Sequence, residues 1–247
     1  MNSNPQNGTS VEKYGLAFHT ATPELGLAIS NFAGDSRCQT WNLGRSLATD
    51  LHQHLVEFIR PQTWADLAFI AVAKGPGGFT GTRMGMVTAR TLAQQLDIPV
   101  FAISTLAAVA WGQPPQPPLS KGGLLSAEPP LASDGLLSAE PPLAKGGLLS
   151  IALQMPAQRG QLFGAVYSVN KDSGLTELFP DTVMTAESWQ EKLESWESSY
   201  QLIEVGSELG SSVSSVLELA YLEWKQGSRP AWSDALPYYG QHPVQGK

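Results

Sequence analysis

The sequence contains little cysteine, little positive charge and no long hydrophobic run. Cys38 is the single cysteine among 247 residues, so no internal disulfide can form, which suits a reducing cytosol. No stretch of about 18 uninterrupted apolar residues occurs, which argues against a membrane-spanning helix. Because 22 acidic residues outnumber 15 basic ones, the formal net charge of −7 disfavours a broad basic surface for nucleic acid. We therefore expect a cytoplasmic protein without a membrane segment, which meets any RNA mainly through partners.

Local signatures of catalysis are also missing. The sequence contains neither the His-Glu-x-x-His motif of zinc hydrolases nor the Gly-x-Ser-x-Gly motif of serine hydrolases. His52 and His54 are two positions apart on a predicted helix, so their side chains point in different directions. The residues therefore give no catalytic group and no metal ligand.

The most informative stretch that is present is a glycine-rich turn at residues 74–83, Lys-Gly-Pro-Gly-Gly-Phe-Thr-Gly-Thr-Arg. An apolar run before it predicts a buried strand at 67–73, and the proline-free segment 80–96 predicts a helix. Such a turn brings backbone amides close to an anion. It matches neither the P-loop nor the Gly-x-Gly-x-x-Gly motif, so a tight turn between strand and helix is the alternative interpretation.

A row of small residues follows on the predicted helix. Its members recur at every fourth position and share one face: Gly81, Gly85, Ala89 and Ala93. Side chains this small allow another segment to pack very close. Either another helix of the same domain or a second subunit fits this pattern, and the residues alone leave both open.

Composition and periodicity divide the chain into four parts. Residues 1–10 predict a loose tail, and residues 11–111 an α/β lobe with two early strands followed by alternating helices and strands. Residues 112–148 carry a 12-residue repeat rich in Pro-Pro and glycine, which predicts a disordered insertion. Residues 149–247 predict a second α/β lobe and a C-terminal tail.

Three segments of the first lobe resemble the TsaB family. The turn resembles that family's Gly-Pro-Gly-Ser-Phe-Thr-Gly-x-Arg signature, with Gly78 in place of the usual serine. Residues 103–106, Ile-Ser-Thr-Leu, resemble its Val/Ile-Ser-Thr-Leu, and residues 19–22, His-Thr-Ala-Thr, resemble its Asp-Thr-Ala-Thr. The second lobe is similar more weakly, around residues 157–163.

The resemblance implies a two-lobe actin-like ATPase (ASKHA) fold of class α/β that has lost catalysis. It also implies a scaffold and activator role in making N6-threonylcarbamoyladenosine (t6A) in tRNA. The partners implied are a TsaD-type transferase subunit and, in a larger complex, a TsaE-type ATPase. ATP and a divalent metal are expected on those partners, and no cofactor on this chain.

The family pairs through helices of its N-terminal lobe, which here correspond to residues 46–60 and 80–96. The resemblance therefore assigns partner binding to seven residues: Leu47, Leu51, Leu55, Gly81, Gly85, Ala89 and Ala93. A homodimer of the free chain through the same face is left open.

Departures from the family pattern bear on the glycine turn. His19 stands where actin-like phosphotransferases have a magnesium-organising aspartate, and imidazole is a poor ligand for magnesium. Three charged residues of the family are also replaced: Pro156, Gln158 and Gln161 stand for an acidic, a basic and another acidic residue. Residues 237–241 lack the Leu-Arg of the family's Pro-x-Tyr-Leu-Arg. We therefore interpret the turn as a vestigial phosphate loop made of Gly75, Gly77, Gly78 and Thr80. The alternative function is a stand-alone actin-like ATP-dependent kinase or ATPase that uses this turn for phosphate.

Overall fold

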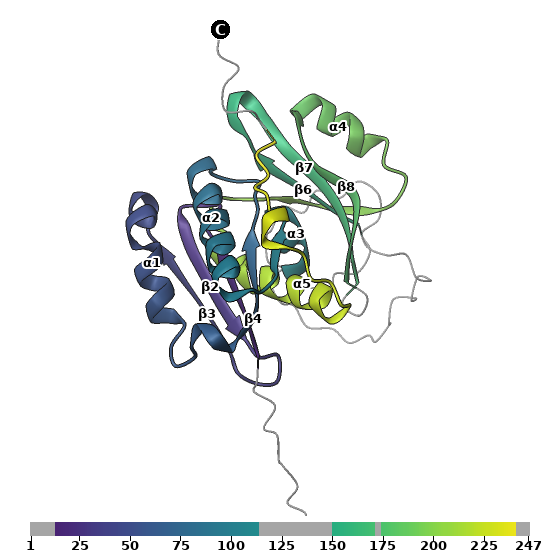
Figure 1. The fold of residues 1–247 in the computed structure, drawn as a ribbon. Coiled ribbons are helices and arrows are strands. Elements are labelled where there is room, and N and C mark those ends of the chain that lie inside the picture. Colours follow the sequence, from purple (N-terminus) through teal and green to yellow (C-terminus); the bar gives the residue numbers. More distant parts are fainter. Residues whose placement is uncertain (1–12, 114–149, 171–173, 241–247) are drawn as a thin grey trace, which may run out of the picture. The chain divides into compact units, whose positions relative to one another are not determined.

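The computed structural model describes residues 13–113, 150–170 and 174–240 (Figure 1). The described chain forms two compact units. The first takes the residues up to Gln113 together with those from Val205 onward, and the second takes those from Ser150 to Glu204. The predicted architecture of two α/β lobes is thus confirmed.

A five-stranded mixed sheet forms the centre of the first unit. Its strands are β1 (Tyr14–His19), β2 (Glu24–Ser30), β3 (Ser36–Asn42), β4 (Leu67–Ala73) and β5 (Val100–Ile103). The order across the sheet is β3-β2-β1-β4-β5, with β1, β2 and β3 antiparallel and β1, β4 and β5 parallel. Parallel neighbours need crossover connections, and α1 (Leu47–Phe58) and α2 (Phe79–Leu96) supply them.

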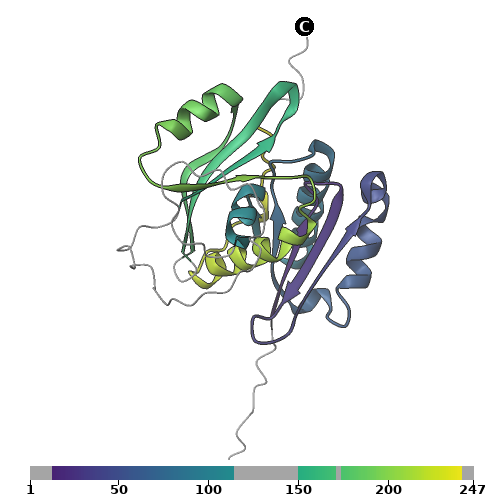
Figure 2. The ribbon, with the colours of Figure 1, turned by 180° about the vertical axis from the view of Figure 1, so that it is seen from behind.

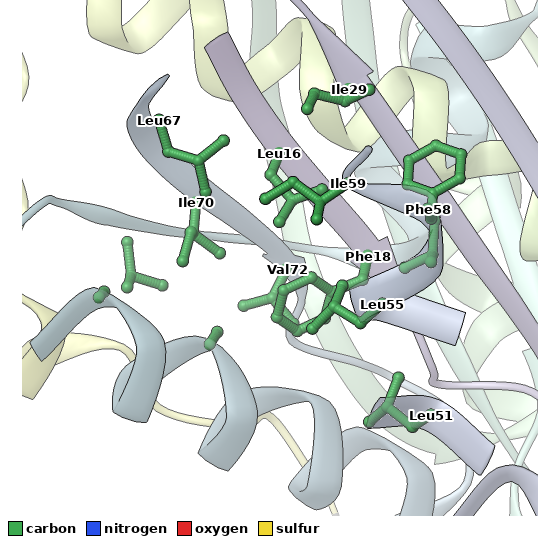
Figure 3. Close-up of a cluster of buried hydrophobic side chains, with 14 of the residues drawn as sticks. Leu16, Phe18, Ile29, Leu51, Leu55, Phe58, Ile59, Leu67, Ile70 and Val72 are labelled. Carbon is green, nitrogen blue, oxygen red and sulfur yellow. The ribbon is translucent and has the colours of Figure 1, made fainter. Parts of the chain in front are cut away.

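The α1 and α2 helices bury their apolar sides on one face of this sheet. Alternate residues of β1 and β4 point toward them, so Leu16 and Ile70 lie in the same core as Leu51 and Leu55 of α1 (Figure 3). All four of these side chains are at most 2% exposed. This packing holds both helices against the strands that carry the glycine turn.

The other face of the sheet is covered by α5 (Val213–Lys225), the yellow-green helix of Figure 2. Phe69 of β4 points to this side, and its ring lies 5.9 Å from that of Trp224 between centroids. The α3 helix (Thr105–Gly112) packs against α5, where Trp111 Nε1 donates to the Glu218 carboxylate at 2.6 Å. The first unit is therefore three layers thick.

The second unit is a smaller four-stranded sheet with one helix. Its elements are β6 (Ser150–Pro156), β7 (Gln161–Asn170), β8 (Gly174–Thr185), α4 (Ala186–Glu194) and β9 (Tyr200–Glu204). The strand order is β8-β7-β6-β9, with only the β6–β9 pair parallel. Trp189 of α4 is buried against the sheet, and its Nε1 donates to Gln154 Oε1 at 3.0 Å.

The observed division of the chain differs from the expected second lobe at 149–247, because the chain returns to the first unit at Val205. The helix at 213–225 has the expected amphipathic pattern, but it buries its apolar side on the first sheet. The Glu24 carboxylate of β2 also accepts from the Gly210 amide at 2.8 Å, which ties the start of this segment to the first sheet. The predicted tail at 1–10 and residues 114–148 of the predicted repeat insertion lie outside the described residues.

Candidate functional site

The glycine turn lies between β4 and α2, so the predicted strand, turn and helix are confirmed. Four backbone hydrogen bonds fix it: Lys74 N to Ile103 O at 2.8 Å, Gly78 N to Ala21 O at 2.7 Å, Thr105 N to Gly75 O at 2.9 Å, and Tyr238 N to Lys74 O at 2.7 Å. The acceptors and donors belong to four different segments of the first unit. The turn therefore joins the carboxyl ends of β1, β4 and β5 to the C-terminal segment.

Two glycines of the turn are required by close contacts. Gly75 has a φ of +99°, and a Cβ there would lie 2.5 Å from the carbonyl oxygen of Tyr238. A Cβ at Gly77 would collide with the carbonyl oxygen of Ala21. Gly78 differs, because its Cβ would meet nothing closer than 3.6 Å. Gly75 and Gly77 thus serve close packing of protein on protein.

The row of small residues on α2 faces the interior of the first unit. Gly81 packs against the carbonyl oxygen of Thr20 and Gly85 against its Oγ1, and Thr20 Oγ1 donates to Gly81 O at 2.8 Å. Ala89 and Ala93 are fully buried in the core. The sequence left open another helix of the same domain or a second subunit. The close neighbour of Gly81 and Gly85 is instead Thr20, just after the end of β1 in the same domain.

The three leucines of α1 expected at a partner interface are also core residues. Leu47, Leu51 and Leu55 are 5%, 0% and 2% exposed. Exposed apolar side chains instead lie on the outer sides of the two helices, where Val56 of α1 is 47% exposed and Val87 of α2 is 56% exposed. Sequence periodicity predicted the apolar stripe of each helix, but it did not predict that these two valines are exposed.

His19 ends β1 with its side chain fully buried. Neither ring nitrogen has a hydrogen-bond partner among the described residues. Burial lowers the pKa of His19 to about 4, so the imidazole is neutral at physiological pH. A neutral, dehydrated imidazole at this position differs in charge and in ligand chemistry from an aspartate.

The C-terminal segment also reaches the site, which the sequence did not predict. Tyr239 places its ring 4.7 Å from that of Phe79 between centroids, at the first residue of α2. Upstream, Ala235 is buried in the core of the first unit, and Arg90 of α2 lies over the ring of Trp232. In the sequence, only the adjacent tyrosines after Pro237 could have indicated this contact, and two neighbouring residues form no periodic pattern that predicts one.

Two general searches of the described residues add no further site. None of the helices in these ranges is both long and apolar enough to span a bilayer. Within the same ranges, no three His, Cys, Asp or Glu side chains gather where they could hold a metal ion.

Comparison with known sequences links the region of the turn to t6A proteins. The TsaD family, described as tRNA N6-adenosine threonylcarbamoyltransferase, matches residues 60–120. A curated protein of Bacillus subtilis, "tRNA threonylcarbamoyladenosine biosynthesis protein TsaB", is 56% identical over 45 residues, which are 18% of this chain. The protein of the same name from Buchnera aphidicola is 48% identical over 48 residues, or 19% of this chain. The chain covers only 20% and 23% of the length of these two relatives.

A longer match and two solved structures extend the comparison. An uncharacterized protein of Mycobacterium tuberculosis is 34% identical over 104 residues, covering 38% of this chain and 46% of that protein. A Pseudomonas aeruginosa structure, described as an uncharacterized protein with similarity to peptidase YeaZ, has a TM-score of 0.65 at 18% identity. It covers 93% of this chain and 100% of its own. A second structure, "YeaZ from Pseudomonas aeruginosa", has a TM-score of 0.64 at 18% identity and covers 92% of this chain and 100% of its own. The fold of this chain is thus YeaZ-like.

Proposed function

We propose that this chain is a non-catalytic subunit of the machinery that makes t6A in tRNA, because it is similar to two TsaB proteins over 45 and 48 residues and has a YeaZ-like fold. In this role it binds and activates a TsaD-type transferase, with a TsaE-type ATPase in a larger complex. ATP and the divalent metal then belong to the partner subunits. The observation that carries the proposal is the 56% identity to the Bacillus subtilis TsaB protein over 45 residues.

The environment of His19 supports a role without catalysis. Hard cations such as magnesium prefer oxygen ligands, and a carboxylate would also supply negative charge. His19 offers a neutral ring that is fully buried at the end of β1. The residue in this position therefore cannot organise magnesium-bound water in the way that an aspartate does.

The arrangement of α2 supports partner binding through the outer sides of α1 and α2. The small residues of α2 hold the helix tightly on β1, because Gly81 and Gly85 both contact Thr20. A helix fixed in this way presents its outer side in one position. Preorganised surfaces bind at a lower entropic cost than mobile ones. Val56 and Val87 are the large apolar side chains most exposed on these two helices.

We expect Val56→Glu together with Val87→Glu to weaken binding of the TsaD-type subunit by at least about tenfold, because an apolar contact is replaced by buried unpaired charge. Both positions are exposed in the free chain, so folding is expected to remain normal. The measurement is isothermal titration with the purified partner. Cellular t6A, quantified by mass spectrometry of digested tRNA after depletion and complementation, should fall in parallel.

Leu178→Glu provides the matched control, because this leucine of β8 is 44% exposed but lies in the second unit. It should bind the partner with wild-type affinity. Wild-type binding by the double valine variant would refute docking through α1 and α2. ATP turnover by the purified chain alone, lost on replacing Thr80, would instead support the stand-alone kinase or ATPase.

A further inference from the structure

The C-terminal segment at residues 236–240, which we call the strap, runs across the glycine turn. Its Tyr238 amide donates to the carbonyl oxygen of Lys74 at 2.7 Å. The next residue, Tyr239, places its ring against that of Phe79, with 4.7 Å between centroids. The strap thus contacts the turn before Gly75 by a backbone hydrogen bond and after Gly78 by a side chain.

At Gly75 the turn packs so closely against the strap that only glycine fits. The left-handed φ of +99° and the short distance from the position of a Cβ to Tyr238 O exclude any larger residue while the strap is in place. The strap also arrives from an anchored position, since Ala235 just before it is 3% exposed within the core. The close contact therefore joins two fixed segments of the same unit.

The backbone groups of the turn at residues 74, 76 and 78 suit a peptide better than a phosphate. An anion site needs several amide hydrogens that converge on the ligand. Here the amides of Lys74 and Gly78 donate to carbonyl oxygens of the protein, and Pro76 has no amide hydrogen. On the strap side the turn offers the Lys74 carbonyl oxygen, which a peptide amide can use and an anion cannot.

We propose that the glycine turn is a docking site for an extended peptide segment, and that its occupant is the chain's own strap at 236–240. The strap binds through the Tyr238 amide and the Tyr239 ring, and it keeps phosphate-bearing ligands out of the turn. This inference concerns contacts within the first unit, so it is independent of any partner protein.

Hydrogen–deuterium exchange of the full-length chain tests the proposal. In the wild type, the Tyr238 amide should exchange at least about tenfold more slowly than an unstructured amide. Gly75→Ala should abolish that protection, because its Cβ displaces Tyr238. Gly78→Ala is the matched control in the same turn, since its Cβ meets nothing closer than 3.6 Å, and protection should persist.

A second variant separates loss of strap docking from loss of folding, and an added ligand tests whether phosphate displaces the strap. Tyr239→Ala removes only the ring on Phe79, so it should speed Tyr238 exchange while amides of β4 and α2 keep their protection. Excess tripolyphosphate should leave wild-type exchange unchanged. The proposal is overturned if Tyr238 is unprotected in the wild type, if Gly75→Ala and Gly78→Ala behave alike, or if tripolyphosphate releases the strap.

Discussion

Gly81→Ala is expected to lower the free energy of unfolding by about 2 kcal/mol, although alanine favours a helix over glycine by about 1 kcal/mol. A Cβ at this position of α2 would collide with the carbonyl oxygen of Thr20, which is a backbone atom just after β1. The helix cannot simply move away, because Thr20 Oγ1 donates to Gly81 O at 2.8 Å. Urea denaturation at neutral pH measures the change.

Thr91→Ala in the same helix gives the comparison for helix propensity alone. Thr91 is exposed, so its replacement should leave stability unchanged or raise it slightly. The sign of the effect at Gly81 is therefore the informative result. Equal effects of the two substitutions would show that α2 does not pack against Thr20 as closely as described.

Elements that depend on local pattern could be predicted from the sequence. The strand at 67–73, the glycine turn and the following helix are set by an apolar run, by turn residues and by the lack of proline. The early hairpin is likewise predicted by two short apolar segments separated by a short turn, and it is observed as β1 and β2. Each of these signals lies within a few residues of the element that it predicts.

Contacts between distant segments could not be predicted in the same way. The spacing of Gly81 and Gly85 indicated a close neighbour, but spacing does not say whether that neighbour is Thr20 or another protein. The amphipathic pattern of α5 indicated one buried side, and it did not say which sheet covers that side. The strap was missed for the same reason, since the Tyr238 contact with Lys74 is a backbone hydrogen bond.

His19 should make the protein less stable in mild acid. Burial lowers its pKa from an ordinary 6.5 to about 4, so the unfolded chain takes up a proton at a higher pH than the folded one. The contribution of the neutral ring is complete above about pH 6.5 and is lost as the pH falls toward 4. Integrating this difference gives a loss of about 2 kcal/mol between pH 7.5 and pH 5.

His19→Gln tests this origin, because glutamine has no proton to gain in this range. The variant is expected to be less stable than the wild type at pH 7.5, since a flexible amide of different shape replaces a packed ring. Its stability should nevertheless change less between pH 7.5 and pH 5, by about 2 kcal/mol. His52→Gln on the exposed side of α1 removes one imidazole elsewhere, and its pH profile should follow the wild type. Parallel urea titrations at the two pH values supply the comparison. If His19→Gln retained the full wild-type loss of stability, the acid sensitivity would have to come from other groups, and His19 would not be the buried neutral base that its surroundings indicate.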